Sequence, residues 1–173
     1  MRAQQYLAQA YWDARRQSDA IKICWNLLKL NPNDNQGIRY ILFDFLLTDN
    51  RLEEIEQLLG KFTEEDFAHW EYDKALYFYK KFGPESEKAK AQILHAEAGN
   101  PHIAKYLVGK LKIPSSGAPD SYSPGSKEEA LCYVQSSLMP WLNTEGAMEW
   151  LKELKLGEAK AKAKAKRKPS KLQ

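Results

Sequence analysis

Cysteine is scarce in this sequence of 173 residues. The two cysteines, Cys24 and Cys132, lie far apart, and each falls within an apolar helical pattern. They therefore form neither a disulfide framework nor a CxxC metal or redox motif. Two cysteines without a predicted disulfide favour a reducing compartment, and we expect a cytoplasmic protein.

Long apolar runs are also lacking. The most hydrophobic stretch, residues 38–47, is short and is interrupted by Arg39 and Asp44. A helix that spans a bilayer needs about 20 predominantly apolar residues, and the first residues carry no apolar segment of the kind found in a signal peptide. We expect neither a membrane span nor a signal peptide.

The sequence contains none of the common catalytic or nucleotide-binding motifs. There is no glycine-rich phosphate loop, no GxSxG nucleophile turn and no HExxH zinc motif. The three histidines, His69, His95 and His102, lack the spacing of a metal site. These absences predict a protein that is not an enzyme and that holds no cofactor or metal.

Residues 31–37 are rich in Asn and Asp, but they lack the alternating carboxylates and the closing Glu of a calcium loop. Side chains of these types turn the chain and cap the following helix. We therefore expect a capped turn here, with Arg39 and Tyr40 linking adjacent helical hairpins.

Charge is unevenly distributed along the chain. The net charge is +3, but residues 157–173 hold seven Lys or Arg against one acid, which gives +6 and leaves −3 on residues 1–156. Residues 159–169 contain no large apolar side chain, so we expect a disordered basic tail. The tail either binds a polyanion such as nucleic acid or an acidic protein, or serves only to keep the chain in solution. In a eukaryote such a run is also typical of nuclear localisation. The candidate polyanion-binding residues are Lys160, Lys162, Lys164, Lys166, Arg167 and Lys168.

A repeat is visible in the remainder of the chain. Asn31-Pro32 recurs as Asn100-Pro101, an offset of 69, and the small or apolar residues of the preceding helix recur at the same offset. This offset is about two periods of 34 residues, the length typical of helical hairpin repeats. With a degenerate middle unit, the pattern predicts three hairpins over residues 1–31, 35–62 and 67–99. Further helices at 102–113, 127–142 and 145–156 cap the stack, which makes residues 1–156 one domain followed by the tail.

The first unit resembles the tetratricopeptide repeat family. The residues that match the family pattern are Leu7, Ala8, Tyr11, Ala20, Leu27 and Pro32, while Gln4 stands where the family usually has tryptophan. The resemblance implies an all-α fold, namely a short right-handed stack of hairpins with a C-terminal helical cap. The small residues let helices approach closely.

The segment from about residue 20 to residue 155 is also similar to the suppressor of tumorigenicity seven family and its bacterial relatives. The matching residues are Leu30 to Tyr40, Asn100 to Leu107, Gly125, Glu129, Ala130, Tyr133, Trp141, Glu145 to Ala147 and Leu151. The resemblance implies an interaction module without a catalytic centre.

In tetratricopeptide stacks the first helix of each hairpin lines a concave surface. That register predicts a groove for a peptide or partner domain, lined by Gln5, Gln9, Trp12, Tyr40, Asp44, Trp70, Asp73 and Tyr77. The dense aromatic run at residues 67–82 fits either such a binding face or packing between repeats. We therefore expect an adaptor or scaffold that binds another protein. The alternative is a nucleic-acid- or ribosome-associated factor that uses the basic tail.

Overall fold

The structure, a computed structural model, describes residues 2–115 and 117–154. All regular structure in these residues is helical, as expected, and they contain no strand. The elements run in the order α1 (Arg2–Asp13), α2 (Gln17–Leu30), α3 (Ile38–Thr48), α4 (Leu52–Lys61), α5 (Ala68–Phe82), α6 (Glu87–Gly99), α7 (Pro101–Leu107) and α8 (Lys127–Leu142). Residues 147–154 form a further helical segment.

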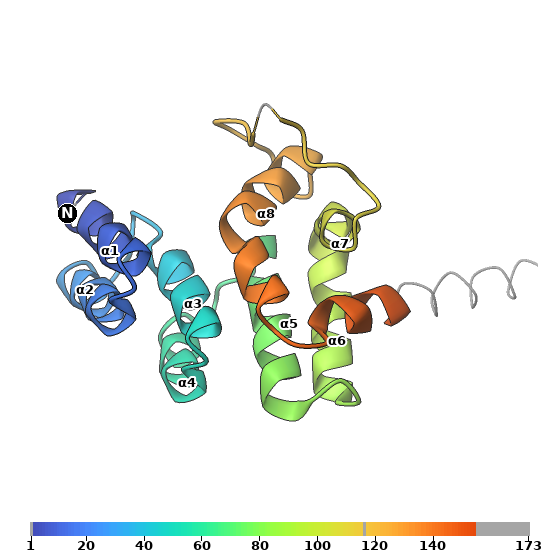
Figure 1. The fold of residues 1–173 in the computed structure, drawn as a ribbon, viewed down its shortest axis with the longest axis horizontal. Helices are drawn as coiled ribbons and strands as arrows, with labels where there is room; N and C mark the ends of the chain where they lie inside the picture. Colours follow the sequence, from blue (N-terminus) through green and yellow to red (C-terminus); the bar gives the residue numbers. More distant parts are fainter. Residues whose placement is uncertain (1, 116, 155–173) are drawn as a thin grey trace, which may run out of the picture.

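The first six helices pair as consecutive hairpins. Helices α1 and α2, α3 and α4, and α5 and α6 pack against each other, and α2 contacts α3 while α5 contacts both α3 and α4 (Figure 1). These helices fall within the three ranges expected from the repeat. Each hairpin thus buries one helical face against its neighbour.

Two of the hairpin turns have the same local structure. Arg15 and Asn50 adopt left-handed conformations with φ of 61° and 58°. In each turn the next residue donates its N–H to the carbonyl five positions earlier, Arg16 to Tyr11 at 2.8 Å and Arg51 to Leu46 at 2.9 Å. This Schellman arrangement satisfies carbonyls at the helix end and reverses the chain.

The repeated Asn-Pro pair also marks equivalent positions in the structure. Asn31 ends α2 with φ −134° and ψ 82°, and Asn100 ends α6 with φ −146° and ψ 99°. Their N–H groups donate to Leu27 and Ala96 at 2.9 and 3.0 Å. The two Asn-Pro pairs, 69 residues apart in the sequence, therefore have similar backbone geometry.

The turn after α2 is capped as expected. The Asp34 carboxylate accepts hydrogen bonds from the N–H groups of Ile38 and Arg39 at 2.8 and 2.9 Å, which satisfies the start of α3. Arg39 and Tyr40 both contact Glu65, at 2.7 and 3.0 Å, and so link α3 to the segment before α5.

Helix α7 is shorter than the expected range of 102–113. It ends at Leu107 because Gly109 adopts φ 74°, and Lys110 then donates its N–H to the Lys105 carbonyl at 2.8 Å. This is again a Schellman ending, to which a left-handed glycine is suited. The described residues between Leu107 and Ser126 (108–115 and 117–125) form no helix, and the Ser126 hydroxyl accepts from the Glu129 N–H at the start of α8.

Helix α8 packs against α7, α3 and α5 (Figure 1). The sequence predicts capping helices at the end of the stack. In the structure α8 instead lies across α3 and α5, the first helices of the second and third hairpins. Residues 147–154 then return to the far end of α5, where Trp150 donates to the Pro84 carbonyl at 3.0 Å. Residues 127–154 thus lie back against the helical hairpins.

The basic tail expected over 157–173 lies outside the described residues. Among the residues that are described, no helix combines the length and apolar character needed to cross a bilayer.

Candidate functional site

A cluster of polar side chains lies where α8 meets α3 and α5. Asp44 comes from α3, His69 and Asp73 from successive turns of α5, and Ser137 from α8. The Ser137 hydroxyl donates to Asp44 Oδ2 at 2.9 Å and lies 2.8 Å from His69 Nε2. His69 Nε2 is 3.4 Å from Asp73 Oδ2 and 3.8 Å from Asp44 Oδ2. Three helices that are distant in sequence therefore meet at one imidazole nitrogen.

Two aromatic side chains of α8 hold Asp73 from the other side. The Tyr133 hydroxyl donates to Asp73 Oδ1 at 2.9 Å, and Trp141 Nε1 donates to the Tyr133 oxygen at 2.7 Å. Asp73, Tyr133 and Trp141 are all buried. This chain of bonds orients the carboxylate toward His69, since one oxygen is held by Tyr133 and the other is left facing the imidazole.

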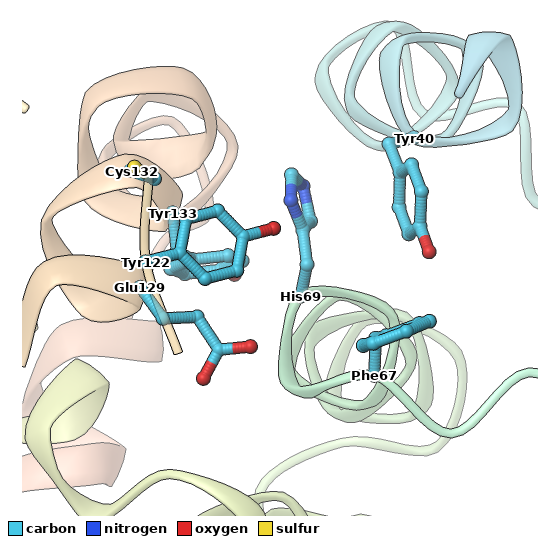
Figure 2. A pocket seen from close by; sticks show the side chains of 7 residues that line it. All are labelled: Tyr40, Phe67, His69, Tyr122, Glu129, Cys132 and Tyr133. Atoms are coloured by element: carbon cyan, nitrogen blue, oxygen red, sulfur yellow. The ribbon is translucent and has the colours of Figure 1, made fainter. Parts of the chain in front are cut away.

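A small pocket opens on one side of His69. It has a volume of about 130 Å³ and is lined by side chains of α3, α5, α8 and the segment before α8. Figure 2 shows His69 rising from the start of α5 between Tyr40 and Tyr133. The centroid of the His69 ring lies 5.0 Å from the centroid of the Tyr40 ring and 4.9 Å from that of the Tyr133 ring. The remaining lining residues are Phe67, Tyr122, Glu129 and Cys132.

Burial and neighbouring charges shift the pKa of each ionisable group in the cluster. Burial raises the pKa of Asp73 well above its ordinary value, and the charge of Asp44 adds to this. Burial likewise raises the pKa of Asp44, against the opposing effect of His69. Burial alone would lower the pKa of His69, but the carboxylates of Asp73 and Asp44 outweigh it and raise this pKa. The two carboxylates therefore favour the protonated imidazole, while burial favours the neutral form of each carboxyl group.

The cluster contains Ser, His and Asp but does not have the geometry of a nucleophilic triad. In a triad the serine donates to one imidazole nitrogen and the carboxylate holds the other. Here the hydroxyl and both carboxylates meet the same nitrogen, and the hydroxyl hydrogen is directed to Asp44. Ser137 is also 0% exposed. The arrangement therefore does not activate Ser137 for attack on a substrate.

A groove runs beside this cluster between α1, α3 and α8. It has a volume of about 400 Å³ and an adjoining hollow of about 360 Å³. Trp12 stacks on Phe45 at 4.0 Å with the rings nearly parallel. Met139 forms the opposite wall and is 55% exposed. The other residues that line the larger part are Gln9, Asp13, Ile41, Asp44, Thr48, Gln135, Ser136 and Pro140.

No family model, curated protein or solved structure matches this chain.

The structure does not bring the residues expected in a binding groove together at one place. Gln9, Trp12 and Asp44 line the groove between α1, α3 and α8, and Gln5 lies half-buried on α1. Tyr40 instead lines the pocket beside His69. Asp44 also belongs to the polar cluster, together with Asp73, which is buried.

The structure places Trp70 and Tyr77 away from the groove. Trp70 is 1% exposed and packs edge-on against Phe43 at 4.8 Å, while the Tyr77 hydroxyl donates to Glu56 of α4 at 2.9 Å. Both side chains face the preceding hairpin, because α5 turns His69 and Asp73 toward α8 instead. For these two residues the structure favours packing between repeats over a binding face.

Sequence patterns did not identify a second groove between α2 and α4. It has a volume of about 770 Å³ and contains Trp25, whose Nε1 donates to Glu54 at 2.7 Å. Lys22, Lys29 and Lys61 lie along it. In the sequence these lysines are indistinguishable from ordinary solvated residues on the outer faces of helices.

Proposed function

We propose that the chain is a non-enzymatic interaction module of tetratricopeptide type, which binds a short segment of a partner protein in the groove between α1, α3 and α8. Three consecutive hairpins, two identical hairpin turns and the matched geometry at Asn31 and Asn100 support the repeat assignment. The observation that carries the binding proposal is the open groove with aromatic and methionine walls.

The groove has the composition of a recognition site for a peptide. Trp12, Phe45 and Met139 supply apolar surface, and an aromatic anchor surrounded by polar groups is typical of the residues that dominate binding energy. Asp13 and Asp44 add negative charge to the larger part, and Arg15 lies in the adjoining hollow. The partner segment therefore has an apolar side chain next to a Lys or Arg.

Selection from a random peptide library displayed on phage tests this proposal, with the full chain immobilised. We expect selected peptides to carry an apolar residue beside a basic one and to bind Met139→Glu roughly tenfold or more weakly, as for the loss of a central contact. Met139 is exposed, so this substitution leaves the fold intact. Trp12→Ala is expected to weaken the same peptides.

The matched control is Leu94→Ala, which removes an apolar side chain from α6 that is 50% exposed. The selected peptides should bind this variant as they bind the native chain. Peptides that bind Met139→Glu and the native chain equally, or a selection that yields no specific peptide, would contradict the proposal.

A further inference from the structure

The polar cluster offers several ligand atoms to one point in space. One ligand atom from each of Asp44, His69 and Asp73 lies within 4.8 Å of the others, and the Ser137 hydroxyl oxygen lies within 2.9 Å of two of these side chains. We propose that these four residues bind a divalent transition-metal cation of the Zn²⁺ or Mn²⁺ type, which joins α8 to α3 and α5. The site shares Asp44 with the groove, but metal binding does not require a bound peptide.

The spacing of the donor atoms fits such an ion. Bonds of about 2.0–2.2 Å in a tetrahedral arrangement place neighbouring ligand atoms about 3.4 Å apart. His69 Nε2 lies 3.4 Å from Asp73 Oδ2 and 3.8 Å from Asp44 Oδ2. The Ser137 oxygen lies closer, 2.8 Å from His69 Nε2 and 2.9 Å from Asp44 Oδ2, so its side chain has to rotate outward to admit an ion. The ion then takes the place of the proton on Nε2.

Two oxygens of the cluster lack hydrogen-bond donors. Among the described residues, Asp44 Oδ1 and Asp73 Oδ2 are buried and accept no hydrogen bond. Asp73 is 0% exposed. Buried carboxylate oxygens are costly unless a donor or cation faces them. A cation bound at His69 Nε2 would satisfy Asp73 Oδ2 directly and would place a positive charge beside the Asp44 carboxylate, whereas one imidazole can neutralise only one of the two carboxylates.

The supporting side chains have the form expected around a metal ligand. Metal-binding carboxylates are usually held by further hydrogen bonds that orient them. The Tyr133 hydroxyl, itself held by Trp141, fixes Asp73 Oδ1 and leaves Oδ2 for the ion. The pocket beside His69 and the groove beside Asp44 provide approaches from two sides.

The donor set selects the class of ion. Imidazole suits Zn²⁺ and other transition metals, whereas carboxylate and hydroxyl oxygens also suit Mn²⁺ and Mg²⁺. One nitrogen with three oxygens therefore favours Zn²⁺ or Mn²⁺ over Mg²⁺, which prefers oxygen ligands alone. No thiol contributes, since neither Cys24 nor Cys132 belongs to the cluster.

Calorimetric titration of the full chain, freed of metal with EDTA, tests the site with Zn²⁺, Mn²⁺ and Mg²⁺ in turn. We expect one Zn²⁺ or Mn²⁺ per chain and weaker binding of Mg²⁺. Asp44→Asn and Asp73→Asn should each weaken Zn²⁺ binding by more than about tenfold. Tyr133→Phe should weaken it by about tenfold, as for loss of a supporting hydrogen bond.

His95→Ala is the matched control, because His95 lies near a carboxylate, Glu71, at 3.5 Å but is largely exposed. It should bind Zn²⁺ like the native chain. Thermal unfolding provides a second readout: Zn²⁺ should raise the midpoint of the native chain and of His95→Ala but not that of Asp73→Asn. The absence of stoichiometric binding, or equal binding and equal thermal shifts in Asp73→Asn, would overturn the proposal.

Discussion

At the scale of single residues, Asn100 joins three parts of the fold. Its side-chain oxygen caps α7 at the N–H of His102, and its amide donates to the Ser126 carbonyl and to Glu129 at 2.9 and 2.8 Å. Its backbone carbonyl accepts from the Tyr72 hydroxyl. The residue is fully buried, so no water can replace these partners.

We therefore expect Asn100→Ala to lower the free energy of unfolding by about 2–4 kcal/mol, because the buried Glu129 carboxylate loses a donor and α7 loses its cap. Urea unfolding followed by circular dichroism measures the change. Asn31→Ala is the matched control, since Asn31 has the same backbone conformation but is only half-buried. A loss for Asn31→Ala as large as that for Asn100→Ala would show that the backbone position alone matters.

The two cysteines are expected to differ in reactivity. Burial, with the charge of Asp34, raises the pKa of the Cys24 thiol to about 12. Burial and the charge of Glu129 also raise the pKa of Cys132, but this thiol is only half-buried, whereas Cys24 is 1% exposed. The thiolate is the reactive form. At mildly alkaline pH, iodoacetamide should modify Cys132 in the folded chain, and Cys24 only after unfolding in guanidinium chloride.

Mass spectrometry of the modified peptides measures both rates, and Cys132→Ser isolates the slow site. The pKa of Cys24 is higher in the folded chain than in the unfolded chain, so the protonated thiol contributes fully to the free energy of unfolding below about pH 9. That contribution declines as the pH rises toward 12. Equal modification rates for the two cysteines in the folded chain would contradict the burial of Cys24.

At the scale of elements, the helices and their turns could be predicted because their signals are local. Apolar periodicity, breaker residues and caps lie within a few positions of the features they determine. The ending of α7 is the exception. The apolar positions up to Leu111 favoured a longer helix, but Gly109 provides a left-handed ending that stops it.

The placement of α8 could not be predicted from the sequence. Residues 108–126 separate it from α7, and its hydrogen bonds to Asp44 and Asp73 join positions 93 and 60 residues apart. The one sign of the polar cluster in the sequence is the four-residue spacing of His69 and Asp73, which puts both residues on one helical face. That spacing indicates a shared face but does not reveal which helix covers it.

At the scale of the whole molecule, both proposed sites depend on the position of α8. Its Met139 face completes the groove with α1 and α3, and its Ser137 and Tyr133 complete the polar cluster with α3 and α5. The α8 helix therefore separates an open groove from a buried polar cluster on one side of the hairpins.

A double-mutant cycle between Tyr133 on α8 and Asp73 on α5 tests this position most directly. Urea unfolding of metal-free native chain, Tyr133→Phe, Asp73→Ala and the double variant gives the coupling free energy. A buried hydrogen bond to a carboxylate predicts a coupling of about 1–3 kcal/mol. A coupling of zero, with all four proteins folded, would contradict the packing of α8 on α5 and would remove the basis of the polar cluster.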